Sequence, residues 1–260
     1  MRQSISIISD WKQQDFYTAA LRQQLLYHLP DAGIDDVSHQ VKAFDLMQAA
    51  FIMRSVWKYF PEKSIHLMCV RSEASTDHPH VLLQHKGHFF VGADHGYWPF
   101  ICQETPEKAW LINDETHYSG NSFPELSVFV KVAVAIANNI LPKEAGMPDY
   151  HPKQAAELQP VVEDSVIKAS IIYFDSYGNA ITNLKHSEFE NVAKERKFRL
   201  FLMSEKNKIS KISRSYGDVR QGSLCAVFNS QGLLEIAINE GNLKQLLNLQ
   251  TGDALRIEFD

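Results

Sequence analysis

The chain has 260 residues, of which 45% are hydrophobic and 22% are charged, so it can bury the core of one large domain or two moderate ones. Its formal net charge of -5 argues against a nucleic-acid-binding protein, because such proteins usually carry a basic face. No segment approaches the ~18 apolar residues of a membrane span, and the N-terminus lacks a signal-peptide stretch. We therefore expect a cytoplasmic protein with neither a membrane nor a nucleic-acid partner.

The cysteines give no sign of a disulfide framework or a metal site. Cys69, Cys102 and Cys225 are far apart, their number is odd, and no pair has metal-ligand spacing. Cys69 and Cys225 lie within apolar runs. We expect both to be buried thiols.

The first elements in the chain predict an α/β unit. The apolar run 5–8 predicts a buried strand that stops at Ser9, and residues 18–29 predict the helix that follows. Such folds bind ligands at the carboxyl ends of their strands. The acidic loop that contains Asp10 and Asp15 is therefore the first candidate site.

The same α/β pattern continues to about residue 140. Apolar residues recur at i+3 and i+4 across residues 45–60, which predicts a helix with one apolar face. Pro124 suits the first turn of another helix. The other predicted elements are a central strand over 65–70, a hairpin of strands 81–83 and 88–91, a strand over 110–112 and a helix over 124–140.

The composition changes near Leu141, where prolines become frequent and apolar residues rare. Beyond the change, the strand patterns are 167–174, 224–228, 233–238 and 254–259, with a hairpin turn over 229–232 and a short helix over 242–247. We therefore predict a Rossmann-like α/β domain over residues 1–160, which includes a proline-rich linker over 142–160. A smaller, mostly β, barrel-like domain is predicted over residues 161–260.

Two interpretations are open for Asp10 and Asp15. A carboxylate can accept hydrogen bonds from both ribose hydroxyls of an adenosyl ligand. Alternatively, Asp15 lies where an acidic side chain would cap the following helix. The loop contains no GxGxxG, so an ordinary dinucleotide-binding fingerprint is absent.

A second candidate site is the segment from Asp175 to Asn179, which follows a predicted strand. Asp, Gly and Asn are ordinary turn residues, so a simple β-turn would explain it. The functional interpretation is an adenine site, because the Asn179 amide can pair with the edge of the base while Tyr177 stacks on its face.

The polar loop after the central strand is a third candidate. Arg71, Asp77, His78 and His80 cluster there, which is typical of a catalytic or binding loop. We expect no metal, because the histidines have no acidic or cysteine partner at a helpful spacing. His117 lies in a loop before a helix, where a lone histidine is more often a surface residue than a catalytic one.

Several blocks, taken together and in order, resemble the S-adenosylmethionine (SAM) hydroxide adenosyltransferases, a superfamily shared with the fluorinating and chlorinating adenosyl enzymes. The block at 175–183 is close to the D-x-F-G-N-x-x-T-N motif of that family, and the block at 89–96 resembles its VGPDNG segment. In chain order the blocks are IISD at 7–10 followed by Asp15, VSHQ at 37–40, FDLMQAAF at 44–51, YFP at 59–61, IHL at 65–67, FFVGADHG at 89–96, DSYGNAITN at 175–183, NSQGLLEIA at 229–237 and NEGN at 239–242.

The resemblance implies an α/β N-terminal domain followed by a β-rich C-terminal domain. It also implies a homotrimer, with the ligand held between the N-terminal domain of one subunit and the C-terminal domain of the next. SAM would be substrate or ligand, and no separate cofactor is implied. The roles implied are ribose binding for Asp10, support for Asp15, adenine binding for Tyr177 and Asn179, methionine amino-group binding for Asp175 and methionine carboxylate binding for Ser230.

The reaction implied is nucleophilic displacement at the ribose C5′, with methionine leaving as a neutral thioether. The hydrolytic members hold a water or hydroxide with an Asp, an Arg and a His. This sequence departs from that set in the two loops that stand in place of the family's D-P-G-V-G-x-x-R and F-H-G-R-D segments. Arg71 lies at the Asp position, His78 at the Arg position and Ser119 at the His position.

Three hypotheses follow. The first, which we favour, is an enzyme that hydrolyses SAM to adenosine and methionine with a catalytic set drawn from Arg71, Asp77, His78 or His117. The second is a catalytically silent protein that binds SAM or adenosine. The third is an adenosyltransferase with a different nucleophile, because the halogenating relatives also lack the water-activating set.

Overall fold

The structure is a computed structural model that describes residues 2–113, 122–155 and 158–260. The chain divides into two compact units, Met1–Ala156 and Glu157–Asp260. Within the described ranges, every helix is too short or too polar to cross a membrane.

The first unit is an α/β sandwich built on a mixed sheet. Its strand order is β2-β1-β3-β5-β4-β6, in which β2, β1, β3 and β5 are parallel and β4 is antiparallel to its neighbours. The strands are β1 (Ser4–Ser9), β2 (Gly33–Ser38), β3 (Ile65–Cys69), β4 (His80–His85), β5 (His88–Ala93) and β6 (Lys108–Leu111).

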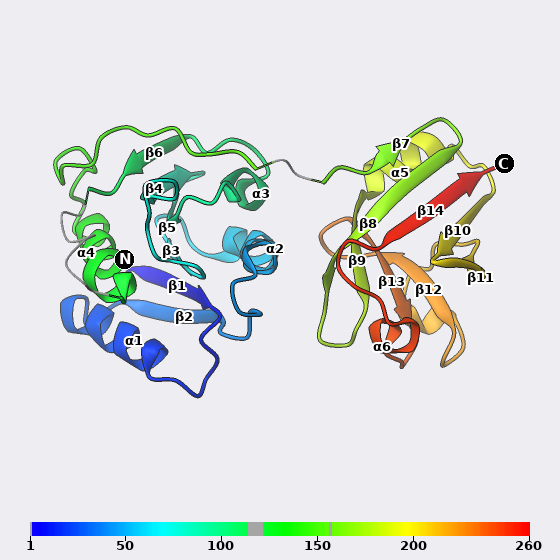
Figure 1. The fold of residues 1–260 in the computed structure, drawn as a ribbon, viewed down its shortest axis with the longest axis horizontal. Helices are drawn as coiled ribbons and strands as arrows, with labels where there is room; N and C mark the ends of the chain where they lie inside the picture. Colours follow the sequence, from blue (N-terminus) through cyan, green and yellow to red (C-terminus); the bar gives the residue numbers. More distant parts are fainter. Residues whose placement is uncertain (1, 114–121, 156–157) are drawn as a thin grey trace. The chain divides into compact units, whose positions relative to one another are not determined.

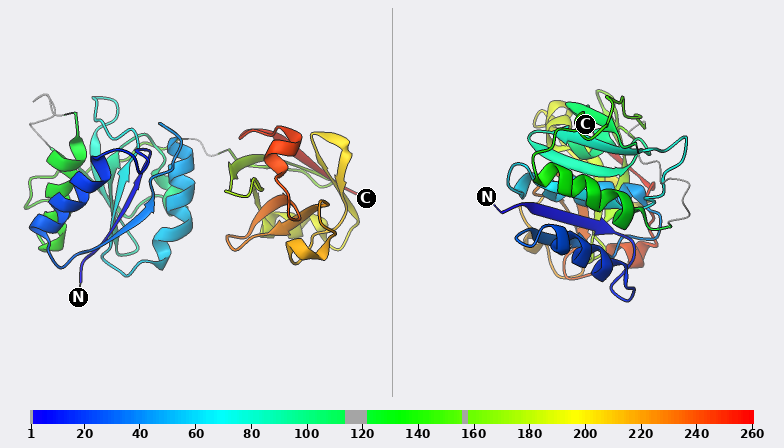
Figure 2. Two further views of the ribbon diagram at one scale, coloured as in Figure 1. Left: turned by 90° about the horizontal axis from the view of Figure 1, so that it is seen from below. Right: turned by 90° about the vertical axis from the view of Figure 1, so that its left-hand side faces the viewer.

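Helices cover both faces of this sheet. Figures 1 and 2 show α1 and α4 on one face and α2 and α3 on the other, in agreement with the contacts between α1 and α4 and between α2 and α3. The helical elements are α1 (Tyr17–His28), α2 (Leu46–Val56) with the 3-10 turn η1 (Trp57–Tyr59), α3 (Trp98–Cys102), the π-helical turn η3 (Glu125–Phe129) and α4 (Val130–Ala137).

Hydrophobic burial fixes these layers. Ile5 and Ile7 alternate along β1 and point toward α1, which packs Leu21 and Leu25 from successive turns into the same core. All four side chains are fully buried. At roughly 1.5–3 kcal/mol for each buried aliphatic side chain, this contact holds the helix against the sheet.

The second unit is a barrel-like β structure. The strand order is β11-β10-β14-β8-β9-β13-β12, β7 pairs with β8, and β11 contacts β12, so the two edges of the sheet approach each other. Its elements are β7 (Val161–Val162), β8 (Val166–Phe174), β9 (Ala180–Lys185), α5 (His186–Ala193), β10 (Phe198–Leu202), β11 (Ser204–Ile209), η4 (Tyr216–Asp218), β12 (Leu224–Phe228), β13 (Leu233–Ile238), α6 (Leu243–Leu247) and β14 (Ala254–Phe259).

The predicted fold class is confirmed: an α/β unit precedes a mostly β, barrel-like unit. The predicted helix over 124–140 differs in detail, because it begins with the π turn η3 and α4 ends at Ala137.

The sequence patterns missed β2, where Asp35 and Asp36 are exposed. An edge strand needs no continuous apolar face, so it gives only a weak sequence signal. The elements α3, β9, α5, β10 and β11 were also missed.

Gly178 offers a test of the packing in the second unit. Its φ of +82° favours glycine, and a Cβ there would overlap the Asn242 side chain, which caps α6. Gly178→Ala is therefore expected to lower the free energy of unfolding by about 2–4 kcal/mol. Gly232→Ala is the matched control, because Gly232 also has positive φ but its Cβ would meet no atom within 4 Å. The control should cost about 1 kcal/mol in urea unfolding, and equal losses would contradict the clash.

Candidate active site

A pocket of about 960 Å³ opens at the carboxyl ends of β1 and β3. The chain runs from β1 outward to β2 and then crosses back over β1 to β3, so this edge is the point where the strand order reverses. Ligands of open α/β sheets bind at such a reversal, because the loops diverge and leave a crevice. The pocket walls come from the loops after β1, β2, β3 and β5 and from the start of η3.

Asp10 lies at the mouth of this pocket, directly after β1. Its carboxylate Oδ2 accepts a hydrogen bond of 2.7 Å from the Phe44 backbone N–H, which ties the loop after β1 to the loop before α2. A second tie runs from the Lys12 N–H to the His39 carbonyl at 2.8 Å. The chain thus holds Asp10 at a fixed place on the pocket wall, with Oδ1 unbonded within the described ranges.

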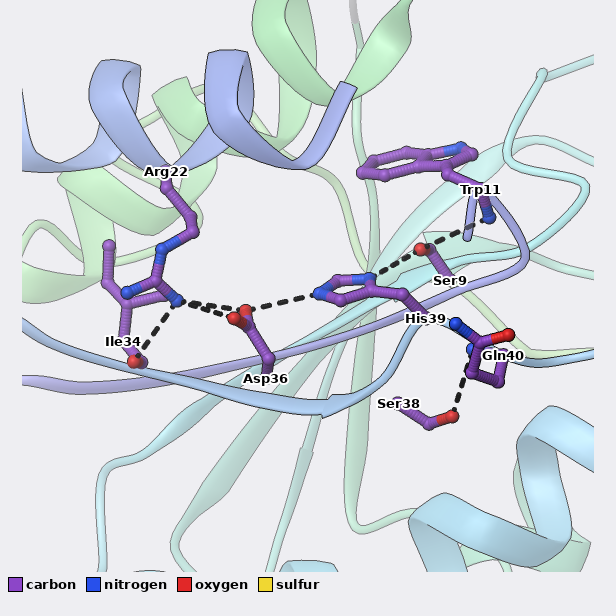
Figure 3. A network of polar contacts seen from close by, with 8 residues as sticks. All are labelled: Ser9, Trp11, Arg22, Ile34, Asp36, Ser38, His39 and Gln40. Carbon is purple, nitrogen blue, oxygen red and sulfur yellow. Dashed lines mark hydrogen bonds and ion pairs between the residues drawn. The ribbon is translucent and has the colours of Figure 1, made fainter. Parts of the chain in front are cut away.

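A polar network supports the loop from behind (Figure 3). The Asp36 carboxylate receives both hydrogen bonds from Arg22, at 2.9 Å each, and lies 3.2 Å from His39 Nε2. That contact lacks hydrogen-bond geometry. Ser9 Oγ and His39 Nδ1 share a hydrogen bond of 2.7 Å, and the Trp11 N–H donates to Ser9 Oγ.

The helix-capping interpretation of Asp15 is wrong. The N-cap of α1 is Phe16, which makes no side-chain cap, and the first turn of the helix contains no acidic residue. Asp15 is instead exposed and lines the pocket with Asp10. Its charge therefore faces the space where a ligand would lie.

Aromatic side chains form one wall of the pocket. The ring centroid of Phe123 lies 5.4 Å from that of Trp11 and 5.2 Å from that of Tyr17, with edge-to-face geometry in both pairs. Phe44 also lines the pocket and is 71% exposed. This wall was not singled out in the sequence, because its rings come from separate loops.

The pocket loops carry strained backbone. Lys12, Phe44 and Arg71 all line the pocket, and their φ angles are 61°, 65° and 47°. A non-glycine residue in this left-handed region costs of order 1 kcal/mol, and such residues concentrate at functional sites. The strain is typical of loops that are shaped to present groups to a ligand.

The loop after β3 brings Arg71 and His78 into the pocket. His78 Nδ1 donates to the Asp94 carbonyl at 3.0 Å, and His95 Nε2 donates to the Arg71 carbonyl at 3.0 Å. Because a carbonyl only accepts, these bonds fix the tautomer of each neutral ring. The free lone pairs are therefore on His78 Nε2 and His95 Nδ1. Burial lowers the pKa of His95, which favours its neutral form.

Of the four residues predicted to form a site in this loop, Arg71 and His78 line the pocket, whereas Asp77 and His80 do not. His80 belongs to β4, is fully buried and donates from Nε2 to the Ser72 carbonyl, so it does not line the pocket. Asp77 is exposed outside the pocket, where its carbonyl accepts from the Lys153 amine. The β4 pairing pulls the chain away from the loop, which sequence proximity alone did not reveal. Ser119 and His117 lie outside the described residues.

Glu125 is a pocket residue that the sequence interpretation missed. The first residue of η3, it lines the pocket yet is only 1% exposed, and Oε1 has no hydrogen-bond partner among the described residues. Burial raises its pKa from 4.5 to about 7; the Ser72 hydrogen bond opposes the shift, and the charges of Asp10 and Glu73 add to it. The sequence signal that could have found Glu125 is its position as a single acidic residue at the start of a mostly apolar helix.

In the second unit, Asp175 closes the predicted turn on itself. Its carboxylate accepts from the backbone N–H groups of Tyr177 and Asn179, at 3.0 and 2.9 Å, and from Asn179 Nδ2 at 3.0 Å. Tyr177 is 74% exposed, whereas Asn179 is buried. The turn is therefore rigid and presents an aromatic ring to solvent.

Ser230 is exposed in the turn between β12 and β13, at the other end of β13 from the Asp175 turn. Between the two turns, buried Glu235 accepts from the Tyr216 hydroxyl at 2.5 Å and from Asn229 Nδ2 at 3.2 Å. These bonds hold the Ser230 turn onto the sheet.

Comparison with known families accounts for both units. The SAM hydroxide adenosyltransferase N-terminal domain matches residues 5–146, and the SAM hydroxide adenosyltransferase C-terminal domain matches residues 169–256. The chain belongs to the SAM hydroxide adenosyltransferase family. The resemblance inferred from the ordered sequence blocks is thereby confirmed.

Relatives with assigned names match over nearly their whole length. A protein of Methanocaldococcus jannaschii named (R)-S-adenosyl-L-methionine hydrolase is 26% identical, covering 98% of this chain and 95% of the relative. A Thermus thermophilus protein of the same name is 24% identical, covering 97% and 98%.

Solved structures share the fold. An uncharacterized conserved protein from Thermotoga maritima has a TM-score of 0.86 at 22% identity, covering 97% of this chain and 99% of its own. A conserved hypothetical protein from Thermus thermophilus has a TM-score of 0.76 at 24% identity, with complete coverage of both chains.

The raised pKa of Glu125 predicts a pH-dependent effect on stability. The unfolded chain loses this proton near pH 4.5 and the folded chain near pH 7, so the folded state binds more protons between these values and the group destabilises the fold as pH rises. The unfolding free energy of Glu125→Gln minus that of wild type should therefore be roughly 2–3 kcal/mol larger at pH 8 than at pH 5. Chemical unfolding at both pH values measures it, and a difference that does not change with pH would contradict the shift.

Proposed function

We propose that this protein binds SAM and catalyses displacement at the ribose C5′ by water, which yields adenosine and methionine. The observation that carries the proposal is the pocket at the strand-order reversal, where Asp10, Asp15, Arg71 and His78 converge from separate loops. Family membership and the names of the relatives support the substrate class.

Asp10 is the proposed ribose ligand. Its Oδ2 is fixed by the Phe44 N–H, and its second oxygen is unbonded within the described ranges, so the carboxylate can accept from the ribose hydroxyls without moving. Asp15 supports it from the same loop. Fixing the carboxylate before the ligand arrives reduces the entropy cost of binding.

The remaining ligand contacts are proposed from the second unit. The exposed ring of Tyr177 and the amide of Asn179 would bind adenine, Asp175 the methionine amino group and Ser230 the methionine carboxylate. The rigid turn closed by Asp175 supports these roles, because its residues are held in place by several hydrogen bonds.

The chemical step makes modest demands on the protein. SAM is a sulfonium ion, and methionine leaves it as a neutral thioether, so no general acid is needed. The site must chiefly orient a nucleophile in line with the breaking bond. Arg71 and His78 line the pocket, and the His78 tautomer leaves the Nε2 lone pair free to accept from a water. We assign these two residues to orienting the water, together with Ser119, which lies outside the described residues.

The homotrimer and the cytoplasmic location stay predictions. Light scattering on the purified protein gives the oligomeric state directly. A monomer that turns over SAM would contradict the trimer and leave the activity assignment intact.

The activity is tested by incubating the purified protein with SAM and separating the products by chromatography, alongside a calorimetric binding titration. We expect adenosine and methionine in equal amounts. Binding without turnover would favour the catalytically silent alternative, and a product that appears only with added halide would favour a different nucleophile. If no adenosyl compound binds, the whole proposal fails.

Substitutions separate binding from chemistry. Asp10→Ala should weaken SAM binding at least 100-fold, because both ribose hydroxyls lose a charged acceptor. Asp10→Asn keeps an acceptor for the Phe44 N–H and tests whether the loop merely collapses. His78→Ala should leave the Kd within about threefold and lower kcat. The exposed Asp35→Ala, outside the pocket, is the control. Equal losses of binding from Asp10→Ala and His78→Ala would contradict these roles.

A further inference from the structure

One buried carboxyl group faces the pocket and has no role in the chemistry described above. Glu125 lines the pocket wall, its side chain is 1% exposed, and Oε1 makes no hydrogen bond with any described residue. Burying a polar oxygen without a partner costs free energy, so a purely structural carboxyl would be expected to have found one. An unpartnered oxygen beside a pocket is instead suited to a group that enters the pocket.

The local backbone is also unusual at this residue. Glu125 is the first residue of the π turn η3, directly after Pro124, and α4 continues from it in ordinary helical geometry. Single π turns are rare and frequently occur at functional sites, because the extra residue re-aims the side chains around it. The turn thus delivers one carboxyl to the pocket from the start of a mostly apolar helix.

The surroundings set the protonation state of this carboxyl. The Ser72 hydroxyl donates to it, while Asp10, Glu73 and the Cys69 thiol face it from the loops after β1 and β3 and from β3 itself. The cations and histidines that line the same pocket are Lys12, Arg71, His78 and His95. Burial and the two acidic neighbours outweigh the Ser72 bond and raise the pKa of Glu125 to about 7, which suits the group to exchanging a proton near neutral pH.

The other pocket carboxylates are less suited to taking a proton. Asp10 is already bonded to the Phe44 N–H and is assigned to the ribose. Asp15 and Glu73 are exposed, where water competes for them. Glu125 alone among the described carboxylates of the pocket is buried, and a water-excluded base is the more effective one.

We propose that Glu125 is the general base of the hydrolysis, an inference that rests on the function proposed above. The oxygen of the attacking water forms a bond to C5′ as the C5′–S bond breaks, and the electron pair of that bond goes to sulfur, which leaves as neutral methionine. The water proton passes to the Glu125 carboxylate and then to solvent when the products leave. Arg71 and His78 orient the water while Glu125 accepts its proton.

The test compares wild type with Glu125→Gln, which keeps the shape and removes the base. We expect kcat for adenosine formation to fall 100-fold or more, with the Kd for SAM within threefold of wild type. The wild-type kcat should rise with pH through about 7, and this rise should be absent from Glu125→Gln but kept in His78→Ala. Glu163→Gln is the matched control: an exposed carboxylate outside the pocket, whose loss should change kcat less than threefold.

Glu125→Asp gives a second measurement, which decides the matter if Glu125→Gln does not fold. It keeps a carboxyl but withdraws it by one methylene, so kcat should fall about tenfold while the pH rise is retained. Thermal unfolding of each variant confirms that it is folded.

Several outcomes would overturn the assignment. Glu125→Gln with kcat within threefold of wild type, or with a Kd raised as much as kcat is lowered, would show that Glu125 is not the base. Glu125→Asp with wild-type kcat would do the same. If the wild-type protein forms no adenosine, both proposals fail; if it forms adenosine and Glu125→Gln does so equally well, only this one fails.

Discussion

The position of β1 between β2 and β3 is the constraint on which the site depends. Parallel pairing on both sides buries β1 from Ile5 to Ser9 and directs the carboxyl ends of three strands to one edge of the sheet. Because the chain reverses its strand order there, the following loops diverge and leave a pocket. The acidic loop, the strained loop after β3 and the start of η3 all reach the pocket for this reason.

Rigidity in the loops follows from polar contacts rather than from packing. Ser9, His39 and Asp36 link the end of β1 to β2, and the Asp10 carboxylate ties its own loop to Phe44. Each contact contributes about 1 kcal/mol, and together they offset the cost of left-handed backbone at Lys12 and Phe44. The second unit uses the same device, with Asp175 binding the turn that presents Tyr177.

The pocket contains two carboxyl groups that lie in different environments. Asp10 is half-buried and held by a backbone donor, whereas Glu125 is buried with one oxygen unpartnered among the described residues, so the two carboxyls are suited to different tasks. The first is held in place to accept hydrogen bonds from hydroxyl groups, and the raised pKa of the second favours an acid that exchanges a proton near neutral pH. Two histidines with fixed tautomers complete the set.

The sequence by itself determined the fold class, the order of the main elements and the family, because hydrophobic periodicity and ordered short motifs are local properties. It also placed Asp10, Arg71 and His78 in loops at strand ends. Only the tertiary structure decided which loops converge. In it, His80 and Asp77 lie outside the pocket, whereas Glu125, which is far along the chain from the loop after β3, lines it. The reason is physical, since burial, hydrogen-bond partners and pKa depend on neighbours that are distant in sequence and meet only when the sheet has formed.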